Sequence, residues 1–301
     1  MNNLTVIRCN HNYNAWKAVR SETGWAFAGV FRPFEKPTAA DAVEESALSL
    51  IPHTTVDVTD AAKGTAPWDT LPRALSDAVC AAVEQGNKVL SLNGYCMLAP
   101  AVAGGIARAL PPQAKLGVVW LDAHYDDIVL ETTGVDETTL VGIPLSTLVG
   151  CTADEWRVNS CKLAKPIPGD RVLHADGRVW VDEERDTILQ SGVRLVDEQG
   201  FADLERWRQA VADFAAEVDA IYLMFDADIM AAEWIPGFYR AEPGGLSREE
   251  VLARLACVMG TGKVAAASTW CFDFDRSPEA VQATAESQEA VVKEILNGWG
   301  F

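Results

Sequence analysis

The sequence has none of the features that direct a chain into or onto a membrane. Its first residues, MNNLTVIRCN, contain no basic segment followed by a long apolar run, so we expect no signal peptide. No stretch reaches the roughly 18 uncharged apolar residues that a membrane-spanning helix needs. We therefore expect no membrane partner.

Paired cysteine motifs are also absent. The seven cysteines are odd in number and include no CxxC pair, which is typical of reduced thiols in a cytoplasmic protein. Cys96 is the exception, because it falls within a motif described below. The other cysteines are expected to be ordinary, mostly buried thiols: Cys9, Cys80, Cys151, Cys161, Cys257 and Cys271.

Basic residues are few. Lys and Arg total 25 against 43 Asp and Glu, a formal net charge of −18. Nucleic acids and anionic lipid surfaces are bound through clusters of Lys and Arg, so this balance argues against both as main partners. An acidic surface attracts a cationic substrate instead.

The chain contains a regular alternation of short β-branched runs and longer helical patterns. Uninterrupted apolar strands that alternate with helices predict an α/β fold with a mostly parallel sheet covered on both faces. No repeat, low-complexity tract or linker interrupts the pattern, so we predict a single domain over residues 1–301. The predicted strands are Leu4–Cys9, Thr54–Val58, Lys88–Leu92, Leu116–Leu121, Arg171–Leu173, Val193–Val196, Ile221–Phe225 and Val264–Thr269. The predicted helices are Leu71–Gln85, Ala99–Leu110, Glu183–Gln190, Leu204–Val218, Arg248–Met259 and Glu279–Leu296.

Polar side chains follow three of the predicted strands. The sequence DAHYD occupies 122–126, Asp226-Ala227-Asp228 follows another strand, and Asn93-Gly94-Tyr95-Cys96 follows a third. In sheets of this kind, ligands bind beyond the carboxyl ends of the strands. Alternate residues of an extended chain project to the same side, so Asp122, His124 and Asp126 can converge if the strand continues, and so can Asp226 and Asp228.

Carboxylates gathered with one imidazole at a single sheet edge would repel one another strongly without a cation. Such hard ligands suit Mn²⁺ better than a closed Zn²⁺ site, which prefers thiolate and imidazole. Carboxylates that bridge two ions about 3.5 Å apart would generate a hydroxide nucleophile at neutral pH. A solvated turn or a helix cap explains one such motif alone, but two after separate strands favour a metal site.

These motifs resemble those of the arginase–agmatinase (ureohydrolase) family. The family pairs an Asp-Ala-His-x-Asp motif with a Phe-Asp-x-Asp strand end and a Pro-x-x-Gly-Gly-Leu segment; this chain has DAHYD at 122–126, MFDAD at 224–228 and EPGGLS at 242–247. The resemblance covers roughly residues 88–296 and implies a single three-layer α/β/α domain. It also implies two Mn²⁺ ions per chain and hydrolysis of a C–N bond in a guanidino compound.

Carried over position by position, the resemblance implies a set of metal ligands. Asp122 and Asp226 would bridge the two ions. Asp126 would complete one ion, and His124 with Asp228 would complete the other. Where the family has a further histidine, in a Gly-Gly-Asp-His turn, this chain has Cys96.

Cys96 has three interpretations. It is a buried thiol beside a weakened site, or a thiolate ligand that the ion itself deprotonates, or, least favoured, a covalent nucleophile. A subgroup, the N-hydroxyarginine hydrolase of D-cycloserine biosynthesis, looks similar in this turn, with Asn-Asn-x-Cys against Asn93–Cys96. It also looks similar at Glu131-Thr132-Thr133. That subgroup converts Nω-hydroxyarginine to ornithine and hydroxyurea.

Other positions depart from the family on the substrate side. The proton-relay histidine of arginases matches Val141, and the asparagine that faces the amino-acid end of the substrate matches Ile128. An amine leaving group needs a proton, so arginine hydrolysis should suffer, whereas a neutral hydroxyguanidine demands less. The histidines that could replace the relay, although a structural role is favoured for each, are His11, His53 and His174.

We expect Asp126, Asp273 and Glu184 to be the catalytic residues. Asp273, or Asp275 as the second candidate, matches the guanidinium-holding carboxylate that follows the last strand of the family. Glu184 matches a substrate-side glutamate of the family. An equally good explanation is structural, because an acidic residue at a helix N-terminus interacts favourably with the helix dipole. The rival hypothesis is a degenerate relative that binds one ion or none and acts as a binding or regulatory subunit. The sequence leaves the exact substrate open, and a homo-oligomer is compatible with it.

Overall fold

The computed structural model describes residues 3–10, 16–32, 38–64, 66–238, 240, 242–272 and 277–301. Its centre is an eight-stranded sheet with the strand order β4-β1-β5-β11-β10-β6-β8-β9. All neighbouring strands in it run parallel. The strands are β1 Leu4–Cys9, β4 His53–Asp57, β5 Lys88–Asn93, β6 Leu116–His124, β8 Val172–Val179, β9 Arg194–Asp197, β10 Ala220–Asp226 and β11 Val264–Trp270.

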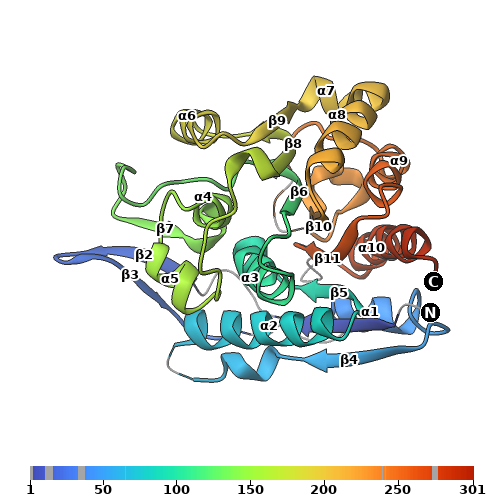
Figure 1. Cartoon of the computed structure of the whole chain (residues 1–301), viewed down its shortest axis with the longest axis horizontal. Helices are drawn as coiled ribbons and strands as arrows, with labels where there is room; N and C mark the ends of the chain where they lie inside the picture. The colour runs from blue at the N-terminus through green and yellow to red at the C-terminus, as the bar shows by residue number, and fades with distance from the viewer. Residues whose placement is uncertain are drawn as a thin grey trace.

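Helices cover the sheet in two groups, which the strands separate in Figure 1. One group contains α2 and α3 together with the short α4 and α5, and the other contains α1 and α7 to α10. This arrangement confirms the predicted α/β class and the mostly parallel sheet. The helices are α1 Ala39–Glu45, α2 Pro67–Glu84, α3 Ala99–Ala109, α4 Pro144–Val149, α5 Asp154–Asn159, α6 Asp182–Gln190, α7 Glu198–Ala202, α8 Leu204–Glu217, α9 Arg248–Met259 and α10 Pro278–Trp299.

The core forms because the central strands are apolar along their whole length. Every residue of β10 is buried, as is every residue of β6 before His124. Helix α2 buries one face through Leu71, Leu75 and Val79. It lies so close to α3 that a Cβ added at Gly105 would sit 2.6 Å from the Ser76 carbonyl oxygen. No helix in the described part of the chain is long and apolar enough to cross a membrane.

Strand β8 differs most from its prediction, since it runs to Val179 rather than ending at Leu173. The added residues, HADGRV, contain a charged pair and a glycine, which local preference assigns to a loop. Parallel pairing with β6 on one side and β9 on the other overrides that preference.

A small antiparallel sheet was not predicted. It has the order β3-β2-β7, with β2 Trp16–Ser21, β3 Gly24–Gly29 and β7 Glu137–Thr139. Strands β2 and β3 form a hairpin that projects from the main body of the molecule (Figure 1). Strand β7 has only three residues, too few for a sequence pattern to reveal.

Candidate metal centre

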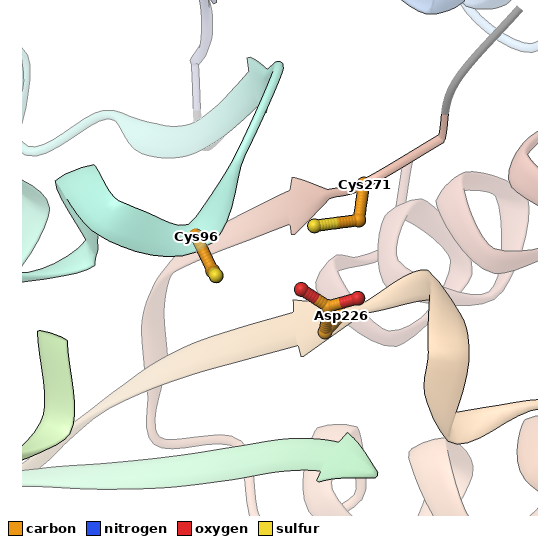
Figure 2. A group of neighbouring side chains, drawn as sticks. All are labelled: Cys96, Asp226 and Cys271. Carbon is orange, nitrogen blue, oxygen red and sulfur yellow. The ribbon is translucent and has the colours of Figure 1, made fainter. Parts of the chain in front are cut away.

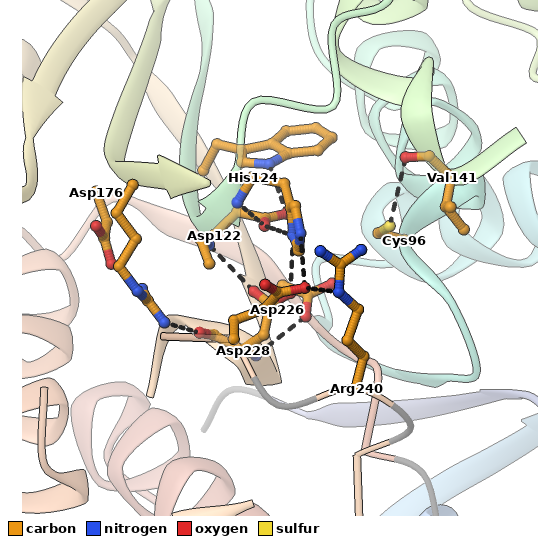
Figure 3. A network of polar contacts seen from close by, with 12 residues as sticks. Cys96, Asp122, His124, Val141, Asp176, Asp226, Asp228 and Arg240 are labelled. Carbon is orange, nitrogen blue, oxygen red and sulfur yellow. Dashed lines mark hydrogen bonds and ion pairs between the residues drawn. The ribbon is translucent and has the colours of Figure 1, made fainter. Parts of the chain in front are cut away.

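The predicted polar side chains meet at one edge of the central sheet. Strands β5, β11, β10 and β6 are neighbours in the sheet and end there together. Asp122 and His124 lie at the end of β6, and Asp226 is the last residue of β10. Asp228 lies in the 3-10 turn that follows β10, and Cys96 begins a 3-10 turn beyond β5. Figure 3 shows these residues around a common space.

Asp126 reaches this space by a turn and not by a continued strand. Strand β6 ends at His124, and its pairing with β8 shifts register between Asp122 and His124. Asp126 then adopts a left-handed backbone with φ of 54°. The condition for the predicted alignment, that the strand continues, is therefore not met at Asp126, which nevertheless lines the same cavity.

Asp122, His124 and Asp228 form a first cluster, which we call the hard half. Their donor atoms lie within 4.8 Å of one another. His124 Nδ1 lies 2.9 Å from Asp228 Oδ2 and 3.6 Å from Asp122 Oδ1. The backbone fixes both carboxylates, because Ala123 N donates to Asp228 Oδ1 and His124 N donates to Asp122 Oδ1.

Cys96, Asp226 and Cys271 form a second cluster, which we call the soft half. Their donor atoms also lie within 4.8 Å of one another, and Figure 2 shows the three side chains directed toward a shared space. The hydrogen bond with Cys271 and burial raise the pKa of the Cys96 thiol well above its ordinary value. Cys271 had been expected to be an ordinary thiol. Its position directly after β11, at the edge where the other ligand candidates gather, was the available signal.

Burial and crowding dominate the electrostatics of the carboxylates. Burial and the neighbouring Asp228 raise the pKa of Asp122 to about 7. Burial with Asp122 raises the pKa of Asp126, and burial with Asp228 raises that of Asp226, both well above the ordinary value. Burial lowers the pKa of His124, but the carboxylates of Asp228 and Asp122 raise it by more. The raised pKa values of the carboxylates indicate that the cluster contains too little positive charge to balance them.

The donor set fits divalent cations. Asp126 Oδ2 is buried and has no hydrogen-bond partner within the described structure, an expensive arrangement for a carboxylate unless a cation contacts it. Around it lie further carboxylates, an imidazole and two thiols. Carboxylate oxygens suit Mn²⁺, whereas sulfur suits softer ions. The two halves together can therefore hold two ions.

The sequence analysis did not identify Glu242 as a site residue. It used the segment at 242–247 only as evidence of the family resemblance. Glu242 Oε1 lies 3.3 Å from His124 Nε2 and 2.9 Å from Arg240 Nε. The imidazole thus has a carboxylate at ion-pair distance on each side, Asp228 at Nδ1 and Glu242 at Nε2, although Glu242 Oε1 makes no hydrogen bond within the described structure. The signal was present in the sequence: an acid directly before the Pro-Gly-Gly turn at 243–245.

A cavity of about 240 Å³ opens over both halves. Its opposite wall is formed by Ile128, Thr138, Val141 and neighbouring residues. Val141 and Ile128 are the two positions predicted to depart from the family, and both lie at the cavity. A larger cavity, of about 710 Å³, lies elsewhere, under the β2–β3 hairpin, and contains no residue of either half.

Glu184 lines the site cavity and also caps its helix. Its Oε2 accepts a hydrogen bond from Val181 N at 3.0 Å, and burial raises its pKa. The helix-capping interpretation of this residue is confirmed, and its substrate-side role stays a prediction. Asp127, beside it, is buried with neither carboxylate oxygen hydrogen-bonded in the described structure; burial and then Glu184 raise its pKa to about 9.

The remaining candidates lie away from the cavity or cannot be placed. His174 is fully buried behind the site, where its Nε2 lies 2.9 Å from the His124 carbonyl oxygen and burial lowers its pKa to about 4. His53 bonds the Ile51 carbonyl oxygen through Nδ1. The predictions for Asp273, Asp275 and His11 lie outside the described residues.

Several known proteins resemble the chain in sequence. An arginase of Brucella melitensis is 31% identical over 183 residues, which cover 59% of this chain and 58% of the arginase. The aligned part thus spans less than two thirds of that relative. A formimidoylglutamase of Ralstonia nicotianae is 26% identical over 252 residues, covering 80% of this chain and 72% of the relative.

Solved structures share the fold. The arginase of Entamoeba histolytica, in complex with L-ornithine, superimposes with a TM-score of 0.80 at 17% identity, covering 100% of this chain and 99% of that one. The formimidoylglutamase of Bacillus subtilis gives 0.70 at 14% identity, covering 99% and 87%. The sequence model of the Arginase family matches residues 36–295 of this chain. This chain belongs to the arginase family.

Proposed function

We propose that the protein is a two-metal hydrolase that cleaves a C–N bond of a guanidino or hydroxyguanidino compound. The observation that carries the proposal is the meeting of the hard and soft halves beneath one small cavity. Family membership supports it, since the matched relatives are named arginase and formimidoylglutamase. Free thiols in the described residues support a cytoplasmic location.

We assign the ligands as follows. Asp122 and Asp226, which end neighbouring strands, would be shared between two ions. Asp126 and Cys96 would complete the ion of the soft half, and His124 with Asp228 that of the hard half, for which Mn²⁺ is the proposed ion. When bound, the ions would supply Lewis acidity that activates water and polarises the carbon under attack.

The protein side chains bind the substrate and move protons. Asp126 Oδ2, free of hydrogen bonds at the cavity, is placed to accept a proton from water. Glu184 presents a carboxylate at the cavity wall to a cationic part of the substrate. Asp273, which follows β11 in the sequence, is proposed to hold the guanidino group.

We favour a hydroxyguanidine, with Nω-hydroxyarginine as the candidate and ornithine and hydroxyurea as products. Val141 places an apolar side chain at the cavity where a relay histidine would donate a proton to the leaving group. A hydroxyguanidine is less basic than the guanidine group of arginine, which stays protonated and charged at neutral pH. Such a substrate enters neutral and depends less on that proton.

A degenerate, regulatory protein is the second candidate. The observation that favours it is the same pair of departures, Cys96 in place of a histidine and Val141 in place of the relay. Metal content separates the two candidates, because a degenerate site holds one ion or none.

The test is a substrate panel with the Mn²⁺-loaded protein. Arginine, Nω-hydroxyarginine and formimidoylglutamate are supplied separately, and ornithine, urea, hydroxyurea and glutamate are quantified. We expect turnover of at least one guanidino compound with close to two ions per chain. Two bound ions without turnover of any of these compounds would leave the metal centre standing and refute the proposed substrate class.

A further inference from the structure

We propose that Cys271 is a ligand of the same ion as Cys96, so that the soft half selects a thiophilic ion, Zn²⁺, while the hard half takes Mn²⁺. This inference rests on the metal centre of the proposed function. It adds a ligand that the motifs do not contain, and it makes the centre heterodinuclear.

The sheet topology places Cys271 between the other two members of the soft half. Strand β11 lies between β5 and β10, and Cys271 is the first residue beyond it. Cys96 follows β5 and Asp226 ends β10, so the three donors come from three adjacent strand ends. Figure 2 shows both sulfurs and the Asp226 carboxylate pointing into the same space.

The backbone at Cys271 is held in a conformation that turns its thiol inward. Its φ is 65°, in the left-handed region that residues with a Cβ rarely adopt. Cys271 N donates to the Gly94 carbonyl oxygen at 2.7 Å, which ties this turn to the one that carries Cys96. Strained conformations of this kind persist where the surrounding structure enforces them, and they cluster at functional sites.

Two thiols and a carboxylate form a different ligand set from that of the hard half. Zn²⁺ is bound by cysteine sulfur, imidazole and carboxylate in four-coordinate sites. Mn²⁺ is the weakest binder of the first-row divalent series and prefers oxygen. Each thiol that binds Zn²⁺ exchanges its S–H bond for an S–Zn bond and releases one proton to the solvent, with no change in oxidation state.

The first measurement counts sulfur atoms around the ion in the unmodified protein. Metal-free protein is loaded with one equivalent of Zn²⁺, and X-ray absorption is recorded at the zinc edge. We expect two sulfur neighbours at about 2.3 Å. One sulfur neighbour would show that only one of the two thiols binds, and none would show that the ion lies away from both thiols; either result overturns the inference. A disulfide between the two cysteines would also overturn it and would appear as lost free thiols.

The second measurement uses Co²⁺ as a spectroscopic probe of thiolate ligation. Parent protein should show sulfur-to-cobalt charge-transfer absorption in the near ultraviolet, and Cys271→Ser should lose about half of it. Cys257→Ser is the matched control, since Cys257 is half-buried on α9 and away from both halves. Equal absorption in Cys271→Ser and the parent would overturn the inference. Circular dichroism checks that each variant is folded. If a variant is unfolded, the zinc-edge measurement on the parent protein still tests the inference.

The third measurement is competition between ions. Parent protein dialysed against equal Zn²⁺ and Mn²⁺ should retain about one of each per chain, and Cys271→Ser should exchange at least part of its Zn²⁺ for Mn²⁺. Two Mn²⁺ ions in the parent would overturn the inference and leave the proposed function intact. A parent that binds no ion would instead overturn the metal centre itself.

Discussion

The hard and soft halves of the centre lie at the same sheet edge but are built in different ways. In the hard half, backbone amides of Ala123 and His124 donate to the two carboxylates, and Glu242 lies at ion-pair distance from the imidazole. In the soft half, two thiols pack at the edge of the hydrophobic core, and Cys96 Sγ makes a 4.0 Å contact with the Val141 carbonyl oxygen (Figure 3). The same sheet edge therefore carries two kinds of candidate ligand. Those of the hard half are fixed by hydrogen bonds, and the two thiols of the soft half are fixed by packing in the core.

The largest effect is expected from removing a ligand of the hard half. Asp228→Ala should lose the ion of that half and reduce kcat by at least about 100-fold, roughly 2.7 kcal/mol of transition-state stabilisation. Removing a carboxylate from a crowded anionic cluster relieves repulsion, so the metal-free variant should remain folded. Elemental analysis and kcat measure both effects.

Asp186→Ala is the control for that change, because Asp186 lies exposed on α6. It should keep the parent metal content and rate. Parent activity in Asp228→Ala would remove the hard half from the mechanism and leave the soft half as the only candidate.

A smaller effect is expected from changing Glu242, which faces a candidate metal ligand rather than the proposed ion itself. Glu242→Gln keeps the size of the side chain but removes the charge that faces His124 Nε2 at 3.3 Å. Residues that orient a metal ligand typically contribute about 10- to 100-fold to metal affinity, so Mn²⁺ affinity should fall by about tenfold or more. Titration with a chelating indicator measures it. If the comparison between halves is correct, Zn²⁺ affinity of the soft half should stay within about twofold of the parent.

The smallest effect concerns substrate preference and the soft half. We expect the parent to cleave Nω-hydroxyarginine at least about tenfold better than arginine, a difference of about 1.4 kcal/mol. A thiolate adds negative charge beside the carboxylates and weakens the Lewis acidity of the ions, which suits a neutral substrate. Cys96→His should therefore narrow the preference.

The measurement is kcat/KM for both substrates in both proteins. Equal values for the two substrates in the parent would refute the preference for a hydroxyguanidine without touching the metal assignment. An unchanged ratio in Cys96→His would show that Val141, and not the thiolate, governs the preference.

Local sequence patterns were sufficient for the strands of the central sheet, for the whole hard half and for Asp226 of the soft half. Each strand of the central sheet was predicted at least in part, and the inner ones most clearly, because buried parallel strands are continuous apolar runs. Asp122, His124, Asp226 and Asp228 were found because their motifs directly follow such runs. The short β7 and the extension of β8 from His174 to Val179 were not predicted, since pairing with distant strands determines both.

The parts of the site that were missed depend on three-dimensional proximity. Cys271 stands 175 positions after Cys96 in the numbering, and only the strand order β5-β11-β10 makes them neighbours. Glu242 meets His124 through a turn with no periodic pattern. Asp126 reaches the site by a turn, because β6 already ends at His124 and Asp126 itself has a left-handed backbone, which local patterns do not reveal.

The small antiparallel sheet ties the far wall of the cavity to a remote part of the chain. Thr138 and Thr139 line the cavity, and they pair with Ala18 and Lys17 of the hairpin. The hairpin precedes the segment that matches the family, which begins at residue 36. A change in the hairpin can therefore reshape the cavity while the candidate metal ligands stay where the central sheet puts them. Part of the cavity wall thus depends on residues that precede the family segment, so a likeness in the candidate ligands alone does not fix the shape of the cavity.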